Sequence, residues 1–190
     1  SPATRLMTMA VTGTNGKTTT SYLMRAAIAS RYPKASLCGT VETHVGPISF
    51  EAVRTTAEAP VIARILAATE QYECGAGIIE LSAHALSLHR VDGIVFDVAA
   101  FTNLQHDHLD YYGDMENYFQ AKALLFTPEH SRRGVVCVDD EWGRRLARQA
   151  TVPVTTVSAL TEEDADWQVR NVTPDQTIGR TVFTLVDPSG

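Results

Sequence analysis

The fold of this 190-residue chain is decided by residues 11–19, Val11-Thr12-Gly13-Thr14-Asn15-Gly16-Lys17-Thr18-Thr19. An apolar run leads into a tight turn with two glycines, and a lysine and hydroxyl side chains then open a segment of helical period. Glycines let successive backbone N–H groups converge on an anion, and the positive end of a helix strengthens such a site. The stretch therefore predicts a strand, a phosphate-binding loop and a helix in immediate succession.

Each part of the loop has an expected role. Lys17 can reach the outer phosphates of a nucleotide, and the Thr18 hydroxyl is placed to bind Mg²⁺. The eight-residue form of this loop has a glycine where this chain has Val11, so the loop here is the shorter Gly-x-x-Gly-Lys-Thr form. The alternative is an ordinary strand–turn–helix connection without a ligand. The expected nucleotide-binding residues are Gly13, Thr14, Asn15, Gly16, Lys17, Thr18 and Thr19.

Composition narrows the class of protein. A net charge of −6 argues against a nucleic-acid surface, which would need a clustered basic patch. The three cysteines have neither disulfide nor metal spacing, which favours a reducing, cytoplasmic location. No apolar run reaches the length of a membrane span. We therefore expect small-molecule partners, with no nucleic acid and no membrane.

Apolar runs typical of strands alternate with segments of helical period along most of the chain. This alternation predicts an α/β fold with a mostly parallel sheet flanked by helices. The expected strands are Met7–Val11, Ala35–Cys38, Gly77–Leu81, Val95–Phe101, Val135–Val138 and Val154–Val157. The expected helices are Lys17–Arg31, Pro60–Glu73, Met115–Phe126 and Glu141–Gln149, with Asp114 and Asp140 as N-caps of the last two.

From Glu162 on, the sequence pattern differs from that of the preceding part of the chain. Trp167–Val172 and Thr181–Val186 are expected to pair as antiparallel strands around a turn at Thr173-Pro174-Asp175-Gln176. The sequence thus predicts a small antiparallel β appendage near the C-terminus, followed by a linker at residues 188–190.

Polar residues at the carboxyl ends of the strands are the candidates for a site, because ligands gather there in parallel sheets. Glu80 ends an apolar run, and a carboxylate beside a phosphate loop is a typical second ligand for the Mg²⁺ of a nucleotide. A solvated strand-end glutamate is the alternative. His106, Asp107, His108 and Asp110 follow another strand, where a metal-binding, phosphate-orienting or helix-capping role is open to each.

Two basic residues stand out beyond the loop. Lys122 lies inside an apolar helical segment, where burial of an ammonium is costly. It either extends to solvent or is kept neutral enough to react or to bind metal. Arg90 follows the third expected strand and either holds an anionic substrate group or pairs with a surface acid.

Taken together, these residues resemble the Mur ligases, specifically the central ATP-binding domain of the MurE type. The spacing of fourteen residues from His108 to Lys122 fits that type. The matching blocks are residues 13–19, Thr55-Thr56, Glu80 to Leu86, Arg90-Val91, and Phe101 through His108-Leu109-Asp110 to Lys122. The short loop is the form that this family uses.

The resemblance implies an ATP-dependent ligase of peptidoglycan synthesis that adds a third amino acid to UDP-N-acetylmuramoyl-L-alanyl-D-glutamate through an acyl-phosphate. It implies ATP and Mg²⁺ as cofactors, with Thr18, Glu80 and His108 at the metal ions. Lys17, His108 and a carbamylated Lys122 are implied as catalytic residues. The implied contacts to the UDP-muramoyl dipeptide are Thr55, Thr56, Ser82 and Arg90.

The same resemblance assigns residues 1–190 to the central domain alone. The family's N-terminal UDP-binding domain and C-terminal ligase domain are expected outside this chain, as partners within one enzyme, and we expect the chain alone not to ligate. Ala83, Leu88 and Arg54 depart from common family residues, which would suit a relative with another acceptor. The alternatives are a folylpolyglutamate or cyanophycin synthetase type of ligase and a non-catalytic nucleotide-binding module.

Overall fold

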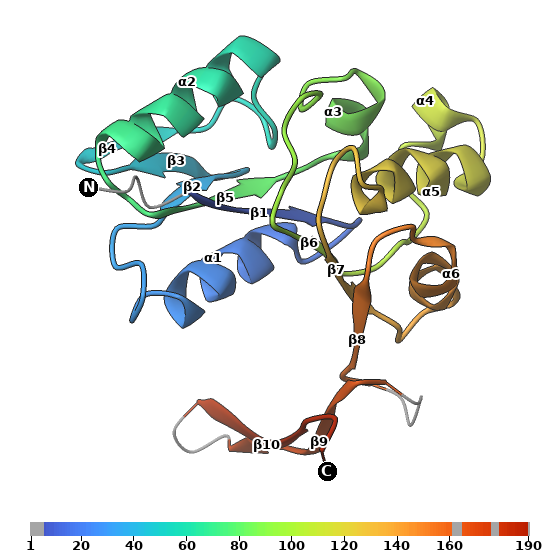
Figure 1. The fold of residues 1–190 in the computed structure, drawn as a ribbon. Helices are drawn as coiled ribbons and strands as arrows, with labels where there is room; N and C mark the ends of the chain where they lie inside the picture. The colour runs from blue at the N-terminus through green and yellow to red at the C-terminus, as the bar shows by residue number, and fades with distance from the viewer. Residues whose placement is uncertain (1–5, 161–164, 176–178, 190) are drawn as a thin grey trace.

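A computed structural model describes residues 6–160, 165–175 and 179–189 of the chain. Its strands form one sheet in the order β10-β9-β8-β7-β6-β1-β5-β2-β3-β4. Helix α1 (Lys17–Ala27) lies on one side of the central strands and α2 (Ala59–Gln71) on the other, as Figure 1 shows. None of the described helices is long and apolar enough to cross a membrane.

The middle of the sheet is parallel, as the sequence predicted. β1 (Met7–Thr12) pairs in parallel with β5 (Ala76–Glu80) on one side and with β6 (Val98–Phe101) on the other. β2 (Ser36–Cys38), β7 (Gly134–Cys137) and β8 (Val154–Ser158) extend the same parallel arrangement. Every residue of β5 is buried, because helices cover both of its faces.

Hydroxyl and carboxylate side chains cap several of the helices. Ser82 caps α3 (Ala83–Ser87), and Asp114 caps α5 (Met115–Ala123) by accepting from the Asn117 N–H. Asp140 caps α6 (Glu141–Gln149), so both predicted caps are confirmed. The remaining helical elements are α4 (Leu109–Tyr112) and a 3₁₀ turn, η1 (Leu124–Phe126).

Several predicted boundaries differ from the structure. The first helix ends at Ala27 rather than Arg31, and the helix expected to reach Phe126 changes to 3₁₀ geometry after Ala123. The strand expected from Val95 begins at Val98, because Phe96 forms only an isolated bridge with Ser131. Short elements carry too few periods to be read from sequence. Those missed were β3 (Glu42–Val45), β4 (Ile48–Glu51), α3 and α4.

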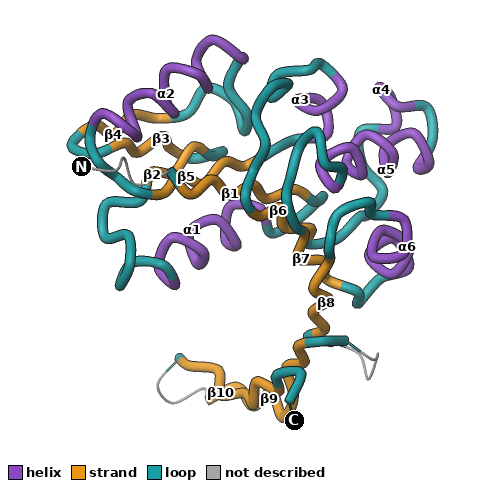
Figure 2. The backbone as a smooth tube through the Cα atoms, viewed as in Figure 1, coloured by secondary structure: helices purple, strands orange, loops and turns teal. Residues whose placement is uncertain are grey.

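The antiparallel appendage is confirmed, but Thr173, Pro174 and Asp175 extend its first strand and pair with β10 instead of forming the expected turn. β9 (Trp167–Asp175) and β10 (Arg180–Val186) pair antiparallel, with an irregularity between Val182 and Thr184. β9 also pairs in parallel with the end of β8, so the hairpin continues the main sheet; it extends away from the helices in Figure 2. The tail's start at Glu162, its turn residue Gln176 and the final Gly190 lie outside the described residues.

Candidate functional site

The loop between β1 and α1 is held by the segment that follows β6. Gly13 has a φ of +148°, and a Cβ there would lie 1.9 Å from the Thr102 Oγ1. The N–H of Thr14 donates to the Asn103 carbonyl at 3.0 Å, and that of Asn15 donates to the Asn103 Oδ1 at 3.0 Å. The N–H groups later in the loop, at the start of α1, differ from these because the first N–H groups of a helix have no intrahelical acceptor.

Two lysines converge on the start of the loop. Lys17 Nζ donates to the carbonyls of Gly13 and Thr14, each at 2.9 Å. Lys122 Nζ, from α5, also donates to the Gly13 carbonyl at 2.9 Å. The Lys122 side chain is therefore buried rather than extended to solvent, with only 1% of the residue exposed.

Burial changes the pKa values of both lysines. Desolvation, helped by the positive charge of Lys17, lowers the pKa of Lys122 from 10.5 to about 7. Desolvation also lowers the pKa of Lys17, while the charges of Glu80 and Asp107 act to raise it. A substantial fraction of Lys122 is thus a neutral, nucleophilic amine near pH 7.

Glu80, at the end of β5, is the centre of a cluster of hydroxyl groups. The carboxylate is fully buried and accepts from Thr18 Oγ1 at 2.9 Å and from Thr40 Oγ1 at 2.8 Å. Ser21 Oγ donates to its other oxygen at 2.8 Å. A Cβ on Gly39 would lie 2.2 Å from the Glu80 Oε1, so glycine is needed there for the carboxylate to fit. Carboxylate and hydroxyl oxygens form a donor set that suits Mg²⁺.

Three of the predicted substrate residues, Thr55, Thr56 and Ser82, are connected to Glu80 by hydrogen bonds. Thr40 donates its single hydroxyl proton to Glu80, so it accepts from Thr55 Oγ1 at 3.2 Å and links Thr55 to the carboxylate. Thr56 is buried: its hydroxyl donates to the Glu80 carbonyl at 2.8 Å and accepts from the Ser82 N–H at 2.9 Å. In this structure the Thr56 hydroxyl therefore fixes the end of β5.

Arg90 reaches the same segment. Its Nη1 donates to the Thr56 carbonyl at 3.1 Å. Its Nε lies 3.1 Å from a carboxylate oxygen of Glu58, yet the angle is not that of a hydrogen bond, and this buried Nε has no hydrogen-bond partner. Charge attraction alone thus links Nε to Glu58.

His108 lies on the Lys122 side of the site. It precedes α4 with a φ of +53°, and its ring centroid is 5.0 Å from that of His84 and 6.0 Å from that of Tyr118. No group of three His, Cys, Asp or Glu side chains that could hold a metal occurs in the described part of the chain. A metal at Glu80 would accordingly depend on hydroxyl and phosphate oxygens for its other ligands.

The sequence analysis assigned no role to several residues that complete the site. They are Ser21, Gly39, Thr40, Asn103 and Tyr118. Position offered a signal for three of them: Gly39 and Thr40 directly follow β2, and Asn103 follows β6, at the strand ends where ligands gather. Tyr118 lies four residues before Lys122, the spacing at which helical side chains are neighbours.

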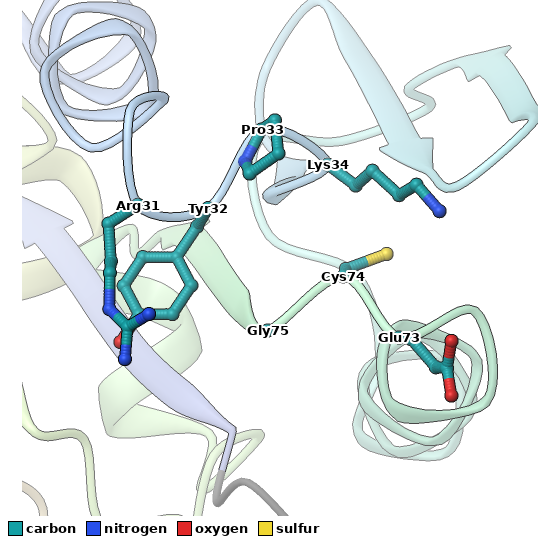
Figure 3. A pocket seen from close by; sticks show the side chains of 7 residues that line it. All are labelled: Arg31, Tyr32, Pro33, Lys34, Glu73, Cys74 and Gly75. Atoms are coloured by element: carbon teal, nitrogen blue, oxygen red, sulfur yellow. The ribbon is translucent and has the colours of Figure 1, made fainter.

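A pocket elsewhere in the molecule is not part of this site. It is lined by residues 31–34 and 73–75, and Figure 3 shows their side chains around it. Gly75 directly precedes β5, whereas Glu80 ends that strand. The pocket therefore lies at the amino-terminal end of β5, whereas the phosphate loop lies at the carboxyl ends of the strands.

The chain is similar in sequence to curated ligases from other bacteria. A curated relative from Leifsonia xyli, "UDP-N-acetylmuramyl-tripeptide synthetase", is 48% identical over 95% of this chain and 35% of its own length. A "UDP-N-acetylmuramoyl-L-alanyl-D-glutamate--2,6-diaminopimelate ligase" from Streptomyces coelicolor is 46% identical over 100% of this chain and 37% of its own. The chain thus spans about a third of the length of these relatives.

A solved structure of such a diaminopimelate ligase superposes with a TM-score of 0.85 at 30% identity, over 97% of this chain and 38% of that one. The family model described as "Mur ligase middle domain" matches residues 11–189, from the last residues of β1 through the antiparallel hairpin. The chain belongs to the Mur ligase middle domain family.

Proposed function

We propose that this chain is the ATP-binding central domain of a MurE-type ligase. Such an enzyme joins diaminopimelate or lysine to UDP-N-acetylmuramoyl-L-alanyl-D-glutamate. The observation that carries the proposal is the 2.9 Å hydrogen bond between Thr18, at the end of the phosphate loop, and the buried carboxylate of Glu80. A hydroxyl and a carboxylate meeting directly after a loop of this form are the pair that holds the Mg²⁺ of a bound nucleotide.

The residues of the loop divide the work of binding ATP. Lys17 leaves the carbonyls of Gly13 and Thr14 and turns to the outer phosphates, where its charge offsets theirs. Thr18 and Glu80 would hold Mg²⁺, which neutralises charge on the phosphates, and His108 would assist at a second ion. Backbone N–H groups at the start of α1 complete the anion site.

The proposed reaction has two balanced steps. The substrate carboxylate attacks the γ-phosphorus of ATP; its O–P bond forms as the bond to the bridging β,γ-oxygen breaks, giving an acyl-phosphate and ADP. The amine of the incoming amino acid then attacks the acyl carbon, phosphate leaves, and the amine proton passes to solvent. Positioning and charge stabilisation are the main contributions of the protein to such chemistry.

Lys122 is proposed to act as a carbamate. Its neutral amine attacks the carbon of CO₂, an N–C bond forms, and one N–H proton leaves to water, so a buried cation becomes an anion. The buried position and the pKa of about 7 both favour this reaction, because only the neutral amine is nucleophilic.

Thr55, Ser82 and Arg90 are proposed to contact the UDP-muramoyl dipeptide, with Thr56 fixing the segment that carries them. Arg90 brings a guanidinium to the Thr56 carbonyl, and its positive charge suits an anionic group of that substrate. The relatives are about three times as long as this chain, so domains on either side would supply the remaining contacts. We expect the 190-residue chain to bind nucleotide without forming tripeptide.

Titration calorimetry with ADP tests the proposal. Wild-type chain should bind ADP in the presence of Mg²⁺, Lys17→Ala should bind at least tenfold more weakly, and Lys34→Ala, an exposed lysine beside the opposite pocket, should bind like wild type. Equal affinity in Lys17→Ala and wild type would refute the role of the loop. Tripeptide formed by this chain from ATP, the UDP-muramoyl dipeptide and diaminopimelate would refute the expected need for further domains.

A further inference from the structure

Tyr118 lies between the phosphate loop and the helix that carries Lys122. The residue is on α5 and only 1% of it is exposed. Its Oη is 3.3 Å from the Thr14 Oγ1, and its ring faces Lys122 Nζ, which lies 4.6 Å from the ring centroid. One side chain therefore contacts a loop residue through its hydroxyl and the buried amine through its ring.

The hydrogen bonds of Thr14 define what the Tyr118 hydroxyl does. Thr14 Oγ1 accepts from the Gln105 N–H at 3.0 Å and lies 3.3 Å from the Gln105 carbonyl. A threonine hydroxyl has one proton and two lone pairs. All of these contacts are satisfied when Thr14 donates to the Gln105 carbonyl and accepts from the Tyr118 phenol. Burial raises the pKa of Tyr118, so the phenol keeps the proton that it donates.

The Tyr118 ring and the Gly13 carbonyl occupy two directions around the Lys122 nitrogen. The ring attracts an ammonium through its negative face, and the carbonyl accepts a hydrogen bond from it. Gly13 and Thr14 are adjacent in the loop, so α5 contacts it at two neighbouring residues, at Gly13 through the lysine and at Thr14 through the tyrosine hydroxyl.

We propose that Tyr118 is a positioning residue of the phosphate loop, whose hydroxyl fixes Thr14 and thereby holds the loop in the shape that receives a nucleotide. The proposal rests on the function proposed above for its nucleotide, but the ordering of the loop by Tyr118 does not depend on it. The position of the phenol also links the loop to the helix that carries Lys122.

The alternative is that Tyr118 only fills the core. Its ring does pack against Tyr112, at a centroid distance of 5.2 Å, and near His108. Tyr118→Phe separates the two roles, because it keeps the ring and its contact with Lys122 and removes the hydroxyl alone. Tyr112→Phe is the matched control: it removes a neighbouring hydroxyl that contacts Ser87 instead of the loop.

Two measurements on the 190-residue chain decide the matter. Amide hydrogen exchange without ligand should be faster at residues 13–16 in Tyr118→Phe, and unchanged there in Tyr112→Phe. Affinity for ADP with Mg²⁺ should fall about fivefold in Tyr118→Phe, the effect of one neutral hydrogen bond, and stay within about twofold in Tyr112→Phe.

The outcomes distinguish this proposal from the proposed function. If amide hydrogen exchange at residues 13–16 of Tyr118→Phe is as slow as in the wild type, the positioning role is overturned, whether or not the chain binds ADP. If the loop of Tyr118→Phe exchanges faster than that of the wild type, and the wild type does not bind ADP, the positioning role is supported and the proposed function is refuted. In a longer enzyme with ligase activity, the same variant should raise KM for ATP and leave kcat unchanged.

Discussion

Lys17 and Lys122 donate hydrogen bonds to the same oxygen, the carbonyl of Gly13, each at 2.9 Å. Two ammonium groups that share one acceptor repel each other, which is one reason for the low pKa of Lys122. The arrangement also means that the Gly13 carbonyl keeps one donor if the other lysine is removed. Burial of the charged Lys122 therefore lowers the stability of the fold, and the Gly13 carbonyl would still have Lys17 as a donor without it.

Lys122→Met is expected to stabilise the chain at pH 6.5. The pKa of Lys122 is about 7 in the folded chain and 10.5 for a free side chain. Below pH 7 both states are protonated and the full cost of the buried charge is present. Between pH 7 and 10.5 the unfolded state binds more protons, so stability of the wild type rises with pH.

Each pKa unit corresponds to about 1.4 kcal/mol, so the cost of the buried charge at low pH is a few kcal/mol. Denaturant unfolding in bicarbonate-free buffer at several pH values measures it, with Lys34→Met as the exposed control. The gain from Lys122→Met should be largest at pH 6.5 and should shrink toward pH 10. A gain that does not vary with pH would show that the lysine is not titrating as described.

Gly13→Ala should disrupt the loop more than Gly16→Ala. Both glycines have positive φ, +148° and +83°, which costs an alanine about 1–2 kcal/mol in each case. Only at Gly13 would the added Cβ also collide, at 1.9 Å from Thr102 Oγ1 and 3.1 Å from the Asn103 carbonyl oxygen. Thermal unfolding and ADP affinity, measured on both variants, test the difference, and equal losses would argue against a close approach at Gly13.

Removal of Mg²⁺ should weaken ADP binding through Glu80. Chelation with EDTA should reduce the affinity of wild type about tenfold or more, and Glu80→Gln should lose this dependence because an amide is a poor Mg²⁺ ligand. Thr40→Val removes one hydroxyl that orients the carboxylate and should reduce the Mg²⁺ effect partly. Calorimetry with and without Mg²⁺ measures each effect; a full Mg²⁺ response in Glu80→Gln would place the metal elsewhere.

The sequence predicted those parts of the site that depend on local pattern and on one topological rule. The glycine spacing of residues 13–16 sets the loop, and a carboxylate after a buried run places Glu80 at a strand end. The apolar neighbours of Lys122 indicated a lysine with an unusual environment. Each of these inferences needs only residues close in sequence, together with the parallel arrangement of the strands.

The convergence on Glu80 depends instead on register between strands. β2 pairs with β5 so that Cys38 lies opposite Ile79, which brings Thr40 to the carboxylate. Nothing in the sequence near Thr40 specifies that register. The hairpin of β3 and β4 was missed because each strand has only four residues, too few for its pattern to identify a strand.

Thr55 and Thr56 give a last test, because they are adjacent and chemically identical but differ in burial. Thr56→Val would leave the Glu80 carbonyl without its donor and the Ser82 N–H without its acceptor, in a position that is 1% exposed. Each buried unpaired group costs about 1–3 kcal/mol, so we expect a destabilisation of about 2–4 kcal/mol. Thr55→Val removes only a bond to the exposed Thr40 and should cost less than about 1 kcal/mol. Urea unfolding of both variants measures the difference, and similar losses would mean that the Thr56 hydroxyl does not hold the end of β5.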